Sequence, residues 1–324
     1  MPDSLRLPVA VLACSTLLLL FMPSVRASGW EEFLAGVRAE ASAAGISQQT
    51  LDAALSELEP DARVIELDRR QPEGVLTFDE YMESRVPESL IARAAEKYAE
   101  HRPLLEAIAA HYGFDAEYIV AIWAVETRFG SYTGGFDVIA AVATLAFDGR
   151  RSTFFRNELL HALTILEEGH IARTDMTGSW AGAMGQSQFM PSSFNRFAVD
   201  WDLDRRRDIW RNRGDVFASI ANYLARSGWQ RGMRWGGAVT VPSGFDFTRD
   251  DVAPLETWLS RGVAWQGETP VLPLDAAASL VLPSGADGPA FLVFDNYRAI
   301  LKWNRSDYFA MSVTAIADAL SRQS

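Results

Sequence analysis

Cysteine, histidine and runs of basic residues are scarce in this chain of 324 residues. Its one cysteine is Cys14, so disulfide bonds, thiolate ligands and a thiol nucleophile are excluded from the sequence that follows. The four histidines show no HExxH spacing, and no G-x-S-x-G motif is present, so we expect neither a zinc site nor a serine hydrolase. The longest basic run is the arginine triplet 205–207 and the formal charge is −12, so we expect no nucleic-acid partner.

Apolar residues make up 48% of the chain and charged residues 22%, with 14 prolines and 23 glycines. Such a composition is typical of a folded chain and excludes low-complexity and collagen-like classes. At this length the chain can bury a large core in one or two domains.

The N-terminal residues carry an export pattern. Residues 7–22 form one apolar run, and the small residues that a signal peptidase requires end at Ala27. We therefore predict a cleaved secretory signal over residues 1–27. The run is shorter than the roughly 20 residues of a membrane-spanning helix, so we expect no transmembrane segment in the mature chain. Lipoprotein anchoring through Cys14 is the less favoured alternative, because the apolar run continues beyond it.

Helical periodicity dominates the sequence. Apolar residues recur at helical spacing from Trp30 onward, and Gly45 ends that stretch before Ser47, which can cap the next helix. After Trp235, short β-prone stretches alternate with prolines. Further helices are predicted over 88–112, 116–129, 154–169, 192–199, 215–227 and 308–320, and strands over 238–241 and 279–282. The expected fold class is α+β, mainly α, with a small β-rich subdomain.

Glu126 is a candidate general acid. It lies near the end of a very apolar helical stretch that stops at Gly130. Because desolvation disfavours a charged carboxylate, such surroundings raise the pKa and keep a proton available near neutral pH. Donating that proton to a leaving oxygen is what cleavage of a glycosidic bond requires. The structural alternative is an ion pair with Arg128 at the edge of a core.

A glycine-rich segment, GSWAGAMGQSQFMPSS at 178–193, follows about fifty residues later. Its glycines and small residues allow the backbone to approach a ligand closely, and the amides of Gln186 and Gln188 could bind the acetamido group of a sugar. The segment matches neither a P-loop nor a dinucleotide fingerprint.

Four segments together resemble one known family. AIWAVETRFG at 121–130, ATLAFDGRRSTFF at 143–155, GSWAGAMGQSQFMPSS at 178–193 and ANYLARSGW at 221–229 are similar to the lytic murein transglycosylase B family. Order and spacing agree from about Trp30 to the end of the chain. The resemblance implies a lysozyme-like helical core with a flanking helical domain and a small β domain. The expected divisions are 1–27 signal, 28–115 helical domain, 116–235 lysozyme-like catalytic core, 236–290 β-rich subdomain and 291–324 C-terminal segment returning to the core.

The resemblance also implies an activity. Members of this family cleave the MurNAc-β-1,4-GlcNAc bond of peptidoglycan without water and leave 1,6-anhydro-MurNAc ends, with a single acid/base and no cofactor. Glu126 would be that acid/base, peptidoglycan glycan strands the partner, and the periplasm the location. A hydrolysing glycosidase normally uses two carboxylates, but the resemblance gives no such role to Asp137, Asp148 or Glu158, which we interpret as structural.

Substrate contacts carried over from the family fall on a further set of side chains. Aromatic members could stack on sugars, with core packing as the alternative, and arginines could bind substrate carboxylates, with surface ion pairs as the alternative. The set is Tyr81, Arg150, Arg151, Ser179, Gln188, Tyr223 and Asn304. Departures from the family pattern occur at Ala124, Arg128, Trp303 and Phe309, where glycine, asparagine and two tyrosines are expected.

An acidic stretch resembles a calcium loop in part. Asp200, Asp202, Asp204 and Asp208 fall at loop positions 1, 3, 5 and 9. The glycine of position 6 is Arg205 and the glutamate of position 12 is Arg211. We therefore expect the aspartates to form salt bridges with the 205–207 arginines or to cap a turn, and we expect no metal, with calcium as the weaker alternative.

Two other functions stay open. One is a muramidase that hydrolyses the same bond with water, and the other is a peptidoglycan-binding protein without catalysis.

Overall fold

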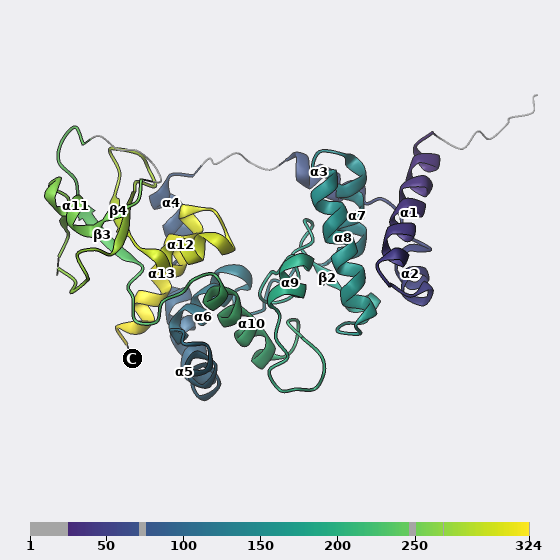
Figure 1. Cartoon of the computed structure of the whole chain (residues 1–324), viewed down its shortest axis with the longest axis horizontal. Coiled ribbons are helices and arrows are strands. Elements are labelled where there is room, and N and C mark those ends of the chain that lie inside the picture. The colour runs from purple at the N-terminus through teal and green to yellow at the C-terminus, as the bar shows by residue number, and fades with distance from the viewer. Residues whose placement is uncertain (1–24, 71–75, 246–250, 268, 324) are drawn as a thin grey trace, which may run out of the picture.

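The computed structural model describes residues 25–70, 76–245, 251–267 and 269–323 (Figure 1). Most of the predicted export signal, Cys14 included, lies outside these ranges. The first described helix begins at Val25, two residues before the predicted cleavage point. Within the described ranges, no helix combines the length and apolar character that crossing a membrane requires.

The molecule is elongated, with a small sheet at one end and the first two helices at the other (Figure 1). As predicted, Ser47 caps the second helix, where its side chain accepts from the backbone amide of Thr50. The indole of Trp30 donates to the carbonyl of Leu58 at 2.8 Å and fixes the first helix against the segment that follows. The N-terminal helices are α1 (Val25–Ala43), α2 (Gln48–Leu55), α3 (Ala62–Arg69) and α4 (Phe78–Arg85).

The central helices confirm five of the predicted ones to within two residues at each end. An additional helix, α7, has eight buried residues and no polar face. Its sequence therefore lacks the apolar stripe by which an amphipathic helix is predicted. It packs against α8. The central set is α5 (Glu88–Tyr112), α6 (Ala116–Thr127), α7 (Val138–Asp148), α8 (Ser152–Glu167), the 3-10 turn η1 (Arg173–Asp175), α9 (Pro191–Phe197) and α10 (Arg213–Arg226).

The β-rich subdomain is a five-stranded antiparallel sheet of order β4-β6-β7-β3-β5 with its own hydrophobic cluster around Trp258. Its elements are β3 (Gly236–Thr240), β4 (Ala253–Pro254), α11 (Leu255–Ser260), β5 (Ala264–Trp265), β6 (Ala277–Val281) and β7 (Ala290–Val293). A separate two-stranded pair joins β1 (Phe136–Asp137) to β2 (Thr177–Gly178).

Two final helices, α12 (Asp295–Trp303) and α13 (Asp307–Ser321), pack on the central helices. Helix α13 lies against α5 and α6, and α12 contacts α10. One hydrophobic cluster extends from Trp30 to Leu320. The predicted mainly helical α+β class is thus confirmed, while the domain boundaries stay a prediction.

Helix α6 ends in an unusual backbone conformation. Arg128 has φ +46° and Phe129 φ +63°, both in the left-handed region, before Gly130 at +79°. This region costs an L-residue roughly 1–2 kcal/mol, and asparagine tolerates it better than most side chains. Phe129 gains packing against Trp123, with ring centroids 5.2 Å apart. The turn directs the chain from α6 toward the glycine-rich segment.

We predict that Arg128→Asn raises the free energy of unfolding by about 0.5–1 kcal/mol, because asparagine relieves the strain of this φ. Urea denaturation measures the change. Arg128→Ala is the matched control, since it removes the same guanidinium but keeps an ordinary β-carbon at positive φ. Equal stability of the two variants would show that strain at this position has no measurable cost.

Candidate active site

Glu126 occupies the last turn of α6, and its side chain is half-buried. Burial raises the pKa of its carboxyl to about 7, and a hydrogen bond that the indole Nε1 of Trp303 donates to Oε1 at 2.7 Å opposes the rise. The carboxyl end of a helix also disfavours a negative charge. The prediction of a dry carboxyl at this position agrees with this geometry, and Trp303 is its hydrogen-bond partner in place of Arg128.

The glycine-rich segment holds the end of α6 through Gln186. The side-chain oxygen of Gln186 accepts from the indole of Trp123 at 2.9 Å, and its amide nitrogen donates to the carbonyl of Trp210 at 2.7 Å. Its backbone carbonyl accepts from the Thr127 hydroxyl at 3.0 Å. The expectation that Gln186 binds a sugar is therefore wrong, because the buried amide is used within the protein.

The glycines of this region make close contacts with protein atoms. A β-carbon at Gly130 would lie 2.4 Å from the Gln186 Oε1, one at Gly178 2.2 Å from the Ala183 carbonyl, and one at Gly185 2.7 Å from Ile209. These contacts with protein atoms already explain why glycine is needed at these positions, without the predicted close approach of a ligand. Their absent side chains let the segment fold closely on itself and pack against the turn that follows α6.

An aromatic cluster positions Trp303. Its ring lies 4.7 Å from that of Tyr223 and 5.2 Å from that of Phe189, centroid to centroid. The Tyr223 hydroxyl donates to the carbonyl of Lys302 at 2.5 Å, and the Lys302 ammonium donates to the carbonyl of Ser227 at 2.7 Å. The end of α12 is thereby fastened to the end of α10. Tyr223 is connected to the candidate acid through Trp303, and its role as a substrate contact stays a prediction.

Four more of the predicted substrate-contact residues belong to the glycine-rich segment or to elements near Trp303. Asn304 follows Trp303 directly and is exposed. The Ser179 hydroxyl accepts from the Ala183 amide, and the Gln188 side chain donates to the carbonyls of Thr133 and Gly185, so both shape the glycine-rich segment. Tyr81 on α4 packs against Tyr308, 5.1 Å away, in the first turn of α13.

Arg150 and Arg151 lie elsewhere. They bind the buried carboxylate of Asp68 at 3.1 and 2.6 Å, where α7 ends beside α3. Figure 1 shows α3 and α7 apart from α12, the helix that ends at Trp303. These contacts favour the ion-pair alternative for both arginines.

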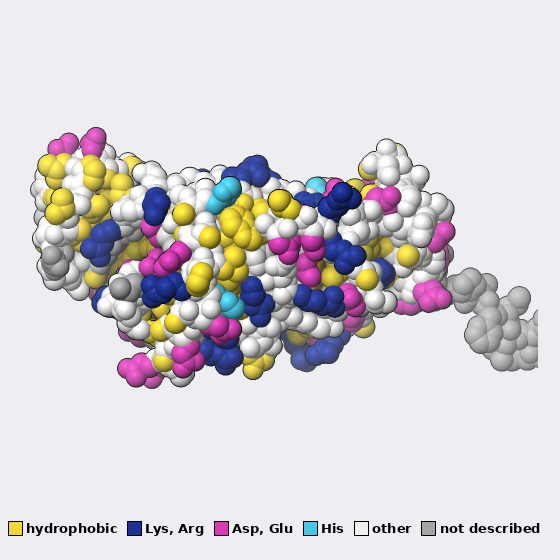
Figure 2. Space-filling model, turned by 90° about the horizontal axis from the view of Figure 1, so that it is seen from below, with side chains coloured by type: hydrophobic (Ala, Val, Ile, Leu, Met, Phe, Trp, Pro, Cys, Tyr) yellow, Lys and Arg dark blue, Asp and Glu magenta, His cyan; other side chains and the backbone are white. Residues whose placement is uncertain are grey.

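Charged side chains of both signs are interspersed along the face shown in Figure 2. The three acids that we interpreted as structural each have a protein partner. Asp137 also caps α7 by accepting from the Ala140 amide, and Glu158 is buried. Asp137, Asp148 and Glu158 interact with Arg173 at 2.7 Å, Arg69 at 2.8 Å and the Ser192 hydroxyl at 2.7 Å, respectively.

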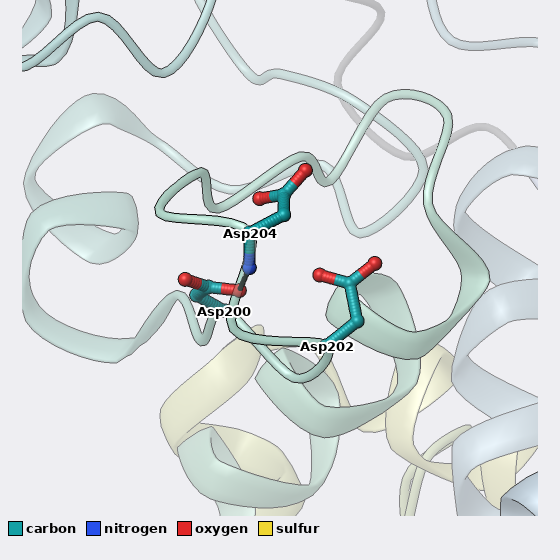
Figure 3. Close-up of side chains that lie close together, drawn as sticks. All are labelled: Asp200, Asp202 and Asp204. Carbon is teal, nitrogen blue, oxygen red and sulfur yellow. Dashed lines mark hydrogen bonds between the residues drawn. The ribbon is translucent and has the colours of Figure 1, made fainter.

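The acidic loop before α10 brings three of its four aspartates together (Figure 3). Carboxylate oxygens of Asp200, Asp202 and Asp204 lie within 4.8 Å of one another. Asp208 is not in this group, because its Oδ1 accepts from two backbone amides that follow it.

Of the two predicted roles of these aspartates, capping of a turn is confirmed, whereas the salt bridges to the 205–207 arginines are not found in the described part of the chain. The oxygens of Asp200 accept from the backbone amides of Asp204 and Arg205 at 3.1 and 2.8 Å, and Arg207 pairs with Glu168.

The loop fits a calcium ion only in part. Arg205, at the position of the usual glycine, adopts φ +75°. Arg211, at the position of the bidentate glutamate, pairs with Asp175 at 2.9 Å. The ligand set of carboxylates is therefore incomplete, and the loop is closed by its own hydrogen bonds.

Comparison with known proteins identifies the fold family. Residues 29–318 match the family described as "Transglycosylase SLT domain". SltB3 from Pseudomonas aeruginosa, solved in complex with NAG-NAM-pentapeptide and with NAG-anhNAM-pentapeptide, is 42% identical with a TM-score of 0.86, covering 90% of this chain and 79% of that one. Escherichia coli Slt35 in complex with calcium is 25% identical with a TM-score of 0.77, covering 91% and 93% of the two chains.

A curated relative agrees. The membrane-bound lytic murein transglycosylase B of Escherichia coli (strain K12) is 34% identical over 219 residues, which are 65% of this chain and 58% of that protein. This chain thus aligns with less than two thirds of that relative. The structural matches confirm the predicted lysozyme-like fold. Since the family match extends over most of the chain, the protein belongs to the transglycosylase SLT domain family.

Proposed function

We propose that this protein is a lytic transglycosylase that cleaves the MurNAc-β-1,4-GlcNAc bond of peptidoglycan and leaves 1,6-anhydro-MurNAc ends. The observation that carries the proposal is the half-buried Glu126, with a pKa raised to about 7, at the end of α6. The three acids considered for a second catalytic role are occupied in structural contacts. The SltB3 complexes, which contain NAG-NAM and NAG-anhNAM peptides, support the same substrate and product.

In the proposed reaction Glu126 acts twice. First its carboxyl proton moves to the glycosidic oxygen, as the bond from that oxygen to C1 of MurNAc breaks and its electron pair stays on the oxygen. The C6 hydroxyl oxygen of the same MurNAc then bonds to C1, and its proton goes to the Glu126 carboxylate. The acid is regenerated, water is not consumed, and the products are a free GlcNAc 4-hydroxyl and a 1,6-anhydro ring.

We place substrate contacts around this carboxyl. Tyr223 and Asn304 flank Trp303, and Ser179 and Gln188 belong to the segment that packs beneath α6. Tyr81, beside the start of α13, extends the set. Arg150 and Arg151 are assigned to holding Asp68.

We also place the protein in the periplasm, because its substrate would be there and residues 1–27 carry a secretory pattern. N-terminal sequencing of the exported protein checks this, since the mature chain should begin at Ser28.

We predict that Glu126→Gln abolishes formation of anhydro-muropeptides, with a loss of roughly 10²- to 10⁴-fold, because the amide cannot donate the carboxyl proton. Mass spectrometry of digested murein measures the products. An anhydro end is lighter than a reducing end by one water molecule, so reducing ends alone would identify a muramidase instead. Glu117→Gln, the same change at the other end of α6, is the matched control and should retain activity. Equal product from the Glu126 variant and the wild type would remove this residue from the mechanism.

The rate should also depend on pH. Because the first step needs protonated Glu126, we predict that kcat/KM falls about tenfold per pH unit above a pKa of about 7. A pH–rate profile on purified murein measures this limb. An alkaline limb that begins below pH 5 would mean that the carboxyl titrates like an exposed glutamate.

The same pKa affects stability. Since the folded-state pKa is raised above the unfolded value of 4.5, the stabilisation from the protonated carboxyl is complete below about pH 4.5 and is lost as the pH rises through 7. At pH 8, Glu126→Gln should therefore have a free energy of unfolding higher than that of the wild type by on the order of 2–3 kcal/mol, as measured by urea denaturation. At pH 4 the two proteins should differ little. This measurement establishes that the inactive variant is folded.

For the acidic loop we predict that a chelator leaves the melting temperature unchanged, because the loop lacks the position-12 ligand and is closed by its own hydrogen bonds. A calcium ion present at 100 times its Kd would add about 2.7 kcal/mol. Scanning calorimetry with calcium and with EGTA distinguishes the two cases. Asp202→Asn is the control, since it removes one charge at equal size. A melting temperature that rises with calcium in the wild type but not in this variant would establish a calcium site.

A further inference from the structure

We propose that Trp303 is a positioning residue that fixes which oxygen of Glu126 carries the catalytic proton. The inference rests on the proposed function of Glu126 and assigns a role to a side chain at which the resemblance led us to expect tyrosine. The indole Nε1 donates to Oε1 of Glu126 at 2.7 Å. No hydrogen bond within the described residues reaches Oε2.

The indole is held firmly enough to select one oxygen. Tyr223 and Phe189 contact its ring, with centroids 4.7 and 5.2 Å away. The backbone at Lys302 is fixed by the Tyr223 hydroxyl, and the Lys302 ammonium is bound to the Ser227 carbonyl. The contact to Glu126 therefore joins two anchored helix ends, the last turn of α6 and the last turn of α12.

The chemistry of the indole N–H determines which of the two Glu126 oxygens carries the proton. An indole nitrogen only donates, whereas a tyrosine hydroxyl both donates and accepts. The oxygen that faces Trp303 must therefore be an acceptor, both in the carboxylate and in the protonated acid. Because the carbonyl oxygen of a carboxylic acid is a better acceptor than its hydroxyl oxygen, the acidic proton is favoured on Oε2, the oxygen left for the substrate. With tyrosine at this position the hydroxyl could accept a hydrogen bond from a protonated Oε1, so neither oxygen would be selected.

The same contact limits how far burial raises the affinity of Glu126 for its proton. A donor favours the carboxylate, so it makes proton release easier in the first step, and it keeps the freed carboxylate oriented for the second. Losing the donor should lower the rate of the chemical step and leave the binding of the glycan almost unchanged.

Two variants remove the donor. Trp303→Phe keeps an aromatic ring against Tyr223 and Phe189, and incorporation of 3-benzothienylalanine at the same position replaces the N–H by sulfur at nearly the same shape. For both we expect kcat to fall about tenfold with KM changed less than about twofold. We also expect the alkaline limb of the pH–rate profile to move up by about one pH unit. Trp229→Phe is the matched control, because that indole donates to Asp115 at 3.0 Å away from the catalytic carboxyl, and it should leave the alkaline limb in place.

Infrared difference titration of the carboxyl band, with Glu126→Gln as the blank, gives the pKa of Glu126 without substrate. An upward shift in both Trp303 variants supports the proposal, and if only the 3-benzothienylalanine protein is stable, an upward shift in that protein supports it. An unchanged pKa and pH profile, or a loss confined to KM, would overturn it and leave Trp303 as a sugar-stacking or packing residue. The proposed function fails separately: in that case Glu126→Gln stays active, whatever the Trp303 variants do.

Discussion

The hydrogen bond from Trp303 to Glu126 is the contact on which the candidate site depends. It joins side chains 177 positions apart, one at the end of α6 and one at the end of α12. Helix α13 follows α12 after a short loop and packs along α6, so that it helps to bury this helix. A carboxyl cannot be both dry and correctly oriented on a single helix, because the residues that desolvate it must come from elsewhere. In this fold the C-terminal helices supply both the enclosure and the donor.

Burying an acid at a helix C-terminus is unfavourable in three ways that act together. Desolvation raises the pKa of Glu126, the negative end of the α6 dipole disfavours its charge, and Arg128 and Phe129, just beyond the helix, adopt positive φ angles. The surrounding contacts offset these costs. Gln186 bonds to both Trp123 and Thr127, and Phe129 packs on Trp123. The strained turn persists because the glycine-rich segment fixes it from below.

Local pattern was sufficient where the controlling forces are local. The helices of amphipathic segments, the Ser47 cap and the half-buried position of Glu126 follow from spacing and neighbouring side chains. Helix α7 was missed because it is apolar on every side. The prediction for Gln186 was wrong because nothing nearby in the sequence reveals the two partners of its side-chain amide, which are the indole of Trp123 and the backbone carbonyl of Trp210. The partnership of Trp303 with Glu126 likewise has no local signal. The expected departure at Trp303 marks the position but does not show that its indole faces Glu126.

Trp303 and Ala124, two positions at which the resemblance led us to expect other residues, can be compared through their physical effect on Glu126. A tyrosine would offer the acid both a donor and an acceptor, whereas Trp303 offers only a donor, so the exchange removes one possible location of the proton. Ala124 is fully buried in α6, two residues before Glu126, where its methyl group adds apolar contact. More burial raises the proton affinity of Glu126 and a charge-stabilising donor lowers it. The two effects oppose each other, so the acid stays poised near neutral pH only while both are present.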